Sequence, residues 1–217
     1  MLKYTQFANL GLTDHGSSSS RPVNKIKMVP QEKVKNFITR FPLLLSTAKK
    51  LNEAGVEWMI GGSGCLFLLG NKRLPEDIDI FLPNDQHDIA DELFEIDSYS
   101  HISPAGPVRN SNPENNHSIQ LTSHLEFNFG KHYEFAITPS VIQNKIPFDS
   151  EGEQLFLLPP EDVLLIKGLL QRGPEEGKED IEDINNFMEI YEIDRFYLSQ
   201  RIKDLGAEQR VGAVFGL

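Results

Sequence analysis

Two carboxylates on one short apolar segment are the residues of this chain best suited to chemistry. Asp77 and Asp79 alternate with isoleucines in the run Asp77-Ile78-Asp79-Ile80-Phe81. In a strand, alternate side chains share a face, so the two carboxylates lie side by side while the isoleucines face the other way. Like charges at this spacing repel unless a cation lies between them. Because Mg²⁺ prefers hard oxygen ligands and takes one or two carboxylates plus substrate phosphates, the pair predicts a magnesium site.

A glycine turn precedes this segment and supplies a second feature of the predicted site. Gly61 and Gly62 allow the backbone to approach a ligand closely, and Ser63 can donate a hydrogen bond to a phosphate at the start of a short helix. The turn is not a P-loop, because no Gly-Lys-Ser/Thr ending follows Gly64, and it lacks the third glycine of a dinucleotide fingerprint. We expect this turn to face the metal site.

Taken together, these residues resemble the nucleotidyltransferase superfamily, which includes antibiotic-modifying and toxin-related members. The resemblance runs from about residue 58 to residue 183 and rests first on Gly62-Ser63, a short helix, Arg73 and the Asp77-Ile78-Asp79 pair. It implies that the two aspartates hold Mg²⁺ on a nucleoside triphosphate such as ATP. It also implies that the nucleotide is bound by Gly61, Gly62, Ser63 and Arg73.

A second stretch, at residues 158–183, resembles the helical end of that family's domain. On a helix, Lys167 lies on an apolar stripe with Val163 and Ile166, so its ammonium group should have a partner, which Asp180 could provide. The resemblance implies that Lys167 approaches the nucleotide phosphates. It further implies that Asp180 or Asp183 orients this lysine or contacts the acceptor.

Members of the family usually add a third carboxylate from a later strand, where it completes the metal site or acts as the base for the acceptor hydroxyl. No aspartate occupies the corresponding strand of this chain. Glu134, in the run from His132 to Ile137, is the first candidate for the third metal ligand, and Glu126 is the second. A glutamate reaches farther than an aspartate and could therefore fill the role from either position.

Several of these residues also have an ordinary structural interpretation. Ser63 could simply cap a helix, and Lys167 could extend along the apolar surface to solvent. Asp180 and Asp183 could form structural salt bridges, and Arg73 could be solvated. Both interpretations stay open from the sequence.

The elements that must position these residues alternate between helices and short strands, which predicts an α+β fold, with helices flanking a short mixed sheet. Residues 102–117 are rich in Pro, Asn, Ser and Gly and read as a long irregular loop. We divide the chain into a polar, flexible N-terminal arm, a nucleotidyltransferase-like core and a C-terminal helical segment packed on the core, at residues 1–28, 29–158 and 159–217. Strands are expected at 56–60, 77–82, 118–122, 125–129, 133–138 and 154–158, and the C-terminal helices at 160–171, 178–191 and 194–204.

Composition limits the classes of function. The 217 residues suit one domain with an accessory segment, and 21 basic against 32 acidic residues give a net charge of −11, so broad nonspecific nucleic-acid binding is excluded. Cys65 is the single cysteine, which excludes an internal disulfide and favours a cytoplasmic location. The sequence contains neither an apolar run long enough to span a membrane nor an apolar signal-peptide stretch, so no membrane partner is expected.

The sequence therefore predicts an enzyme that transfers a nucleoside monophosphate from a magnesium-bound triphosphate to an acceptor hydroxyl, with pyrophosphate leaving. The acceptor could be a small molecule, a tRNA or a protein, and the 102–117 loop could recognise it. The alternative is a catalytically inactive module of the same fold that binds a nucleotide or acts as a regulatory, toxin- or antitoxin-like partner. The absence of a third aspartate motivates this alternative.

Overall fold

A mixed sheet forms the centre of the molecule. The computed structural model describes residues 29–94, 101–103, 106–110 and 119–217, so the expected N-terminal arm and part of the 102–117 loop lie outside the described residues. In the described part, seven strands form one sheet in the order β3-β4-β5-β2-β1-β9-β8, and a separate hairpin consists of β6 and β7. The strands are β1 (Met59–Ile60), β2 (Ile78–Phe81), β3 (His101–Ser103), β4 (Gly106–Asn110), β5 (Ile119–Thr122), β6 (His124–Asn128), β7 (His132–Ala136), β8 (Ile146–Ser150) and β9 (Glu153–Leu157).

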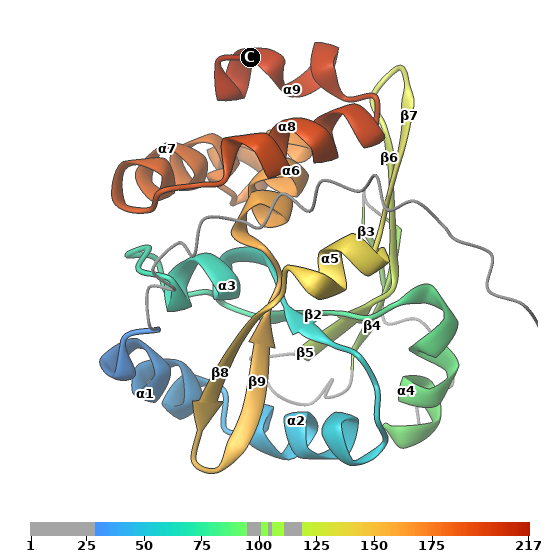
Figure 1. The fold of residues 1–217 in the computed structure, drawn as a ribbon, viewed down its shortest axis with the longest axis vertical. Helices are drawn as coiled ribbons and strands as arrows, with labels where there is room; N and C mark the ends of the chain where they lie inside the picture. Colours follow the sequence, from blue (N-terminus) through green and yellow to red (C-terminus); the bar gives the residue numbers. More distant parts are fainter. Residues whose placement is uncertain (1–28, 95–100, 104–105, 111–118) are drawn as a thin grey trace, which may run out of the picture.

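The longer helices form two groups at opposite ends of the molecule. In Figure 1, α6 to α9 (orange to red) lie at one end of the molecule and α1 and α2 (blue to cyan) at the other, with the central strands between them. This arrangement confirms the predicted α+β class with a mixed sheet. The helices are α1 (Gln31–Arg40), α2 (Leu44–Glu53), α3 (Gly62–Leu68), α4 (His87–Leu93), α5 (Pro139–Gln143), α6 (Pro160–Leu170), α7 (Asp180–Ile190), α8 (Arg195–Asp204) and α9 (Glu208–Phe215), with short 3₁₀ turns η1 (Asn84–Gln86) and η2 (Pro174–Glu176).

The central strands follow the predicted alternation of side chains. Ile78 and Ile80 of β2 are fully buried, whereas Asp79 between them is only half-buried. β2 pairs antiparallel with β1 and parallel with β5, and β1 pairs parallel with β9. Strands that come from distant parts of the chain therefore flank the carboxylate segment on both sides.

Five helices and strands differ from the sequence-based expectation, and one of them is α5, which follows β7 where no helix was expected. Short strands β3 and β4 occupy part of the segment that was expected to be an irregular loop. Strand β8 forms a hairpin with β9 that alternation alone did not reveal, because its side chains are only exposed or half-buried. Helix α9 follows α8, where no helix was expected.

Helix α6 is the centre of the C-terminal segment. All its residues from Pro160 to Leu169 are buried, and it packs against α3, α7, α8 and α9. A proline in the first turn suits the start of this helix, since the missing N–H has no intrahelical partner there. No helix of the described residues is both long and apolar enough to cross a membrane.

A buried ion pair fastens α8 to the start of α6. Asp162, which is fully buried, accepts hydrogen bonds from Arg201 Nε and from the Tyr197 hydroxyl, both at 2.6 Å. The guanidinium of Arg201 also lies 5.3 Å from the centre of the Phe135 ring on β7. A buried carboxylate without its partner is costly, so this pair constrains how the C-terminal helices dock.

Replacing the arginine of this pair should destabilise the fold. We expect Arg201→Met to lower the free energy of unfolding by about 3–5 kcal/mol, because the variant leaves Asp162 buried without its counter-charge. Lys203→Met, an exposed position on the same helix, is the matched control and should change it by less than about 0.5 kcal/mol. Urea unfolding at pH 7 measures both, and equal effects would contradict the structural role of the pair.

Candidate functional site

A pocket opens where β2, the glycine turn before α3 and helix α6 meet. Its volume is about 330 Å³, within the range of small-molecule sites. Its lining combines carboxylates and the glycine turn with basic side chains from α6 and the segment that follows it. The polar lining consists of Gly62, Ser63, Arg73, Glu76, Asp77, Asp79, Gln120, Thr122, Lys167, Arg172, Gly177 and Lys178.

The glycine turn is fitted directly against the carboxylate strand. Gly62 has φ +53°, and a Cβ atom on it would lie 1.9 Å from Asp79 Oδ2. A Cβ atom on Gly61 would lie 2.3 Å from the ring of Phe81, and the Gly61 N–H donates to the Asp79 carbonyl oxygen at 2.8 Å. Both glycines are therefore required by close approach, and at Gly62 also by the backbone conformation.

The two aspartates line the pocket together, and their environment disfavours two negative charges. Burial, and secondarily the charge of Asp77, raises the pKa of Asp79 to about 6. Lys167, Lys178 and Arg172 oppose this shift but do not cancel it. A bound cation would relieve the repulsion between the two carboxylates.

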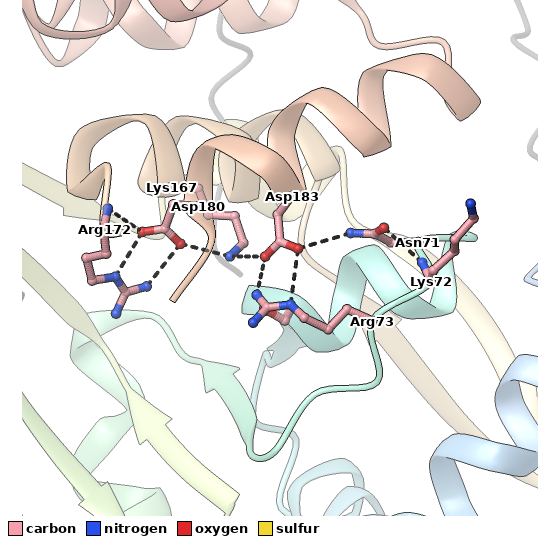
Figure 2. A network of polar contacts seen from close by, with 8 residues as sticks. Asn71, Lys72, Arg73, Lys167, Arg172, Asp180 and Asp183 are labelled. Carbon is pink, nitrogen blue, oxygen red and sulfur yellow. Dashed lines mark hydrogen bonds and ion pairs between the residues drawn. The ribbon is translucent and has the colours of Figure 1, made fainter. Parts of the chain in front are cut away.

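A polar network joins α6 and α7 to the segment after α3, as Figure 2 shows. Lys167 Nζ donates to Asp180 Oδ1 at 3.0 Å and to Asp183 Oδ2 at 2.8 Å, and the lysine is only 4% exposed. Arg172 Nε donates to Asp180 Oδ2 at 2.9 Å, and Arg73 pairs with Asp183. Three cations share two carboxylates, so the network presents a net positive charge at the pocket.

Ser63 belongs to this network and is not a helix cap. The N-cap of α3 is Gly61, without a side-chain cap, and Ser63 lies inside the first turn. Its Oγ accepts from Arg73 Nη2 at 3.2 Å. Because a hydroxyl that accepts one hydrogen bond can still donate its own hydrogen, Ser63 keeps a donor for a ligand.

The structure does not bring the two glutamates expected as a third metal ligand to the pocket. Glu126 and Glu134 face each other across the β6–β7 hairpin, with side chains 52% and 59% exposed. Alternation in β7 buries Tyr133 and Phe135, so Glu134 must point to the solvent side, near His124. Neither glutamate lines the pocket, and the described residues contain no group of three or more His, Cys, Asp or Glu placed to hold a metal.

Five polar side chains of the pocket were not among the predicted site residues: Glu76, Gln120, Thr122, Arg172 and Lys178. Gln120 on β5 lies in register with Asp79 and donates from Nε2 to Asp77 Oδ2 at 3.0 Å. Its alternation with Ile119 and Leu121 in the sequence was a signal that it faces away from the core. Arg172 and Lys178 lie in the stretch that resembles the family, but nothing in their spacing distinguished them from solvated residues.

The fit of Gly62 against Asp79 can be tested by adding a methyl group. We expect Gly62→Ala to abolish the binding of magnesium-nucleotide and to destabilise the protein by more than about 2 kcal/mol, because the new Cβ displaces Asp79. Gly55→Ala is the matched control: Gly55 has φ +68° but nothing within 4 Å of its Cβ position. The control should cost about 1 kcal/mol and retain binding. Calorimetric titration and thermal unfolding measure both effects.

The raised pKa of Asp79 predicts that replacing its carboxylate by a neutral group stabilises the fold of the metal-free protein, and that this stabilisation depends on pH. Its folded pKa of about 6 exceeds the ordinary 3.8, so its stabilising contribution is complete below 3.8 and is lost as pH rises through 6. Asp79→Asn in EDTA should therefore be more stable than the parent at pH 8, by up to about 3 kcal/mol, and not at pH 4. The exposed Asp85→Asn is the control, and thermal unfolding that shows no pH-dependent gain for Asp79→Asn would refute the assignment.

Comparisons with known proteins identify the family of the chain. The family described as "Nucleotidyl transferase of unknown function" (DUF2204) matches residues 40–211. No curated protein sequence matches the chain.

Similar solved structures include ANT(2″)-Ia in complex with adenylyl-2″-tobramycin, at 16% identity and a TM-score of 0.49 over 81% of this chain and 94% of that one. A Thermotoga maritima protein assigned as a nucleotidyltransferase has 14% identity and a TM-score of 0.48 over 69% and 91%. The lincosamide antibiotic adenylyltransferase LnuA has 13% identity and a TM-score of 0.42 over 76% and 99%. Because the family match covers most of the chain, the chain belongs to the nucleotidyl transferase family.

Proposed function

We propose that the chain transfers a nucleoside monophosphate from a magnesium-bound triphosphate, such as ATP, to an acceptor hydroxyl, with release of pyrophosphate. This proposal rests on the adjacency of Asp77 and Asp79 to the glycine turn, in a pocket that is also lined by basic side chains. Membership of the nucleotidyl transferase family supports the class of reaction.

The donor set of the pocket fits one magnesium ion. Asp77 and Asp79 would hold it, and substrate phosphates and water would supply the remaining oxygen ligands, as is usual for Mg²⁺. When bound, the ion would neutralise charge on the phosphates and polarise the phosphoryl group under attack.

The basic side of the pocket would position the triphosphate. Lys167 has three donors, of which Asp180 and Asp183 engage two, so one remains for a phosphate oxygen. Ser63 and the backbone of the glycine turn would bind the β- and γ-phosphates, with the Ser63 hydroxyl oriented by Arg73. In phosphoryl transfer most of the catalytic effect comes from such positioning and charge neutralisation.

A second candidate function is nucleotide binding without turnover. It is favoured by Gln120, a neutral residue next to the carboxylate pair, and by the distance of Glu126 and Glu134 from the pocket. Pyrophosphate release separates the two functions. The protein is incubated with Mg²⁺, each nucleoside triphosphate and a panel of small hydroxylated molecules, tRNA and protein, and tight nucleotide binding with no release under any combination would favour the binding module.

Removal of the carboxylate pair should eliminate both binding and turnover. We expect the double variant Asp77→Asn, Asp79→Asn to bind magnesium-nucleotide at least about 100-fold more weakly than the parent, because no protein carboxylate remains for the ion. The matched control also removes two carboxylates, in Glu126→Gln, Glu134→Gln, and should bind like the parent, since both side chains lie outside the pocket.

Isothermal titration with Mg²⁺-ATP and a pyrophosphate-release assay measure these outcomes. Parental nucleotide affinity in the aspartate double variant would reject the proposed metal site. A loss of binding in the glutamate double variant would instead show that one of those residues serves the site, and that the β6–β7 hairpin moves toward it.

A further inference from the structure

Gln120 occupies the position beside the aspartate pair where a strand neighbour can reach the metal site. β5 runs parallel to β2, and its Gln120 is in register with Asp79. Residues paired across adjacent strands point to the same face, so Gln120 faces the pocket and is part of its lining. Its Nε2 donates to Asp77 Oδ2 at 3.0 Å.

This contact limits the number of cations that the protein can hold. With its amide nitrogen donating to Asp77, Gln120 can offer a cation only its neutral carbonyl oxygen, which brings no negative charge to balance a second ion. Centres with two metal ions, about 3.5–4 Å apart, depend on ligands that serve both ions. Glu76 also lines the pocket, but the described residues contain no group of three or more His, Cys, Asp or Glu placed to hold a metal.

Basic side chains of the pocket supply the positive charge that a second cation would otherwise bring. Lys167 and Arg172 line the pocket together with Lys178. Lys178 is half-buried, and the ion pairs found among the described residues do not include it, so its ammonium group can contact a triphosphate.

We propose that Gln120 is a positioning residue that orients Asp77 and makes this a single-cation centre. The inference rests on the proposed nucleotide-metal function and states how the site carries it out. The hydrogen bond fixes the carboxylate of Asp77 so that its other lone pairs receive the ion. Lys178 neutralises the charge of the phosphates that a second cation would otherwise neutralise.

Manganese binding tests this inference without any turnover. Mn²⁺ is titrated into the full chain, saturated with an α,β-methylene nucleoside triphosphate, and followed by calorimetry and electron paramagnetic resonance. The parent should bind one Mn²⁺ with the signal of an isolated ion. Gln120→Glu adds a carboxylate within reach of Asp77 and should bind a second Mn²⁺, spin-coupled to the first.

Gln120→Ala keeps the pair of aspartates and removes only the hydrogen bond to Asp77. It should still bind one Mn²⁺, with a dissociation constant raised about 10-fold or more, as is typical when a partner of a metal ligand is lost. Gln154→Ala, which replaces an exposed glutamine of the sheet outside the pocket, is the matched control and should bind like the parent.

Each other outcome overturns a defined part of the argument. Two coupled Mn²⁺ ions in the parent would overturn the single-cation centre while leaving the proposed function intact. Unchanged Mn²⁺ affinity in Gln120→Ala would overturn the positioning role. Absence of Mn²⁺-nucleotide binding in the parent would overturn the proposed function and this inference with it.

Discussion

The close approach of Gly62 to Asp79 is the contact on which the rest of the site depends. The carboxylate oxygen lies where a side chain at position 62 would begin, so the turn and the strand can meet only through a residue without Cβ. This contact sets the glycine turn beside the aspartate pair. It also places Asp79 where burial raises its pKa, which makes the site unfavourable for two bare charges and favourable for a cation.

The C-terminal helices complete the site. Lys167 of α6 is held between Asp180 and Asp183 of α7, and Asp183 in turn binds Arg73 from the segment after α3. Because these groups are mostly buried, each depends on the others for compensation of its charge. The same contacts that dock the helices on the sheet therefore build the basic side of the pocket.

The family resemblance implied a third acidic ligand, but within the described residues no third His, Cys, Asp or Glu is placed with Asp77 and Asp79 to hold a metal. The neighbouring strand β5 carries Gln120, which donates a hydrogen bond to Asp77. Basic side chains line the same pocket. Under the proposed function, charge neutralisation would be divided between one cation and fixed side chains, and catalysis would then depend mainly on positioning.

The sequence by itself determined the local elements and half of the site. Alternation along residues 77–81 was sufficient to place two carboxylates on one face, and the glycine turn was readable because glycine has a distinct conformational range. Only the tertiary structure decided the neighbours. Glu134 and Gln120 both alternate with apolar residues. Strand order decides which of them reaches the aspartates: in the described part of the chain, β5 pairs with β2, whereas β7 pairs with β6. That pairing is a long-range contact, which no local pattern of residues encodes.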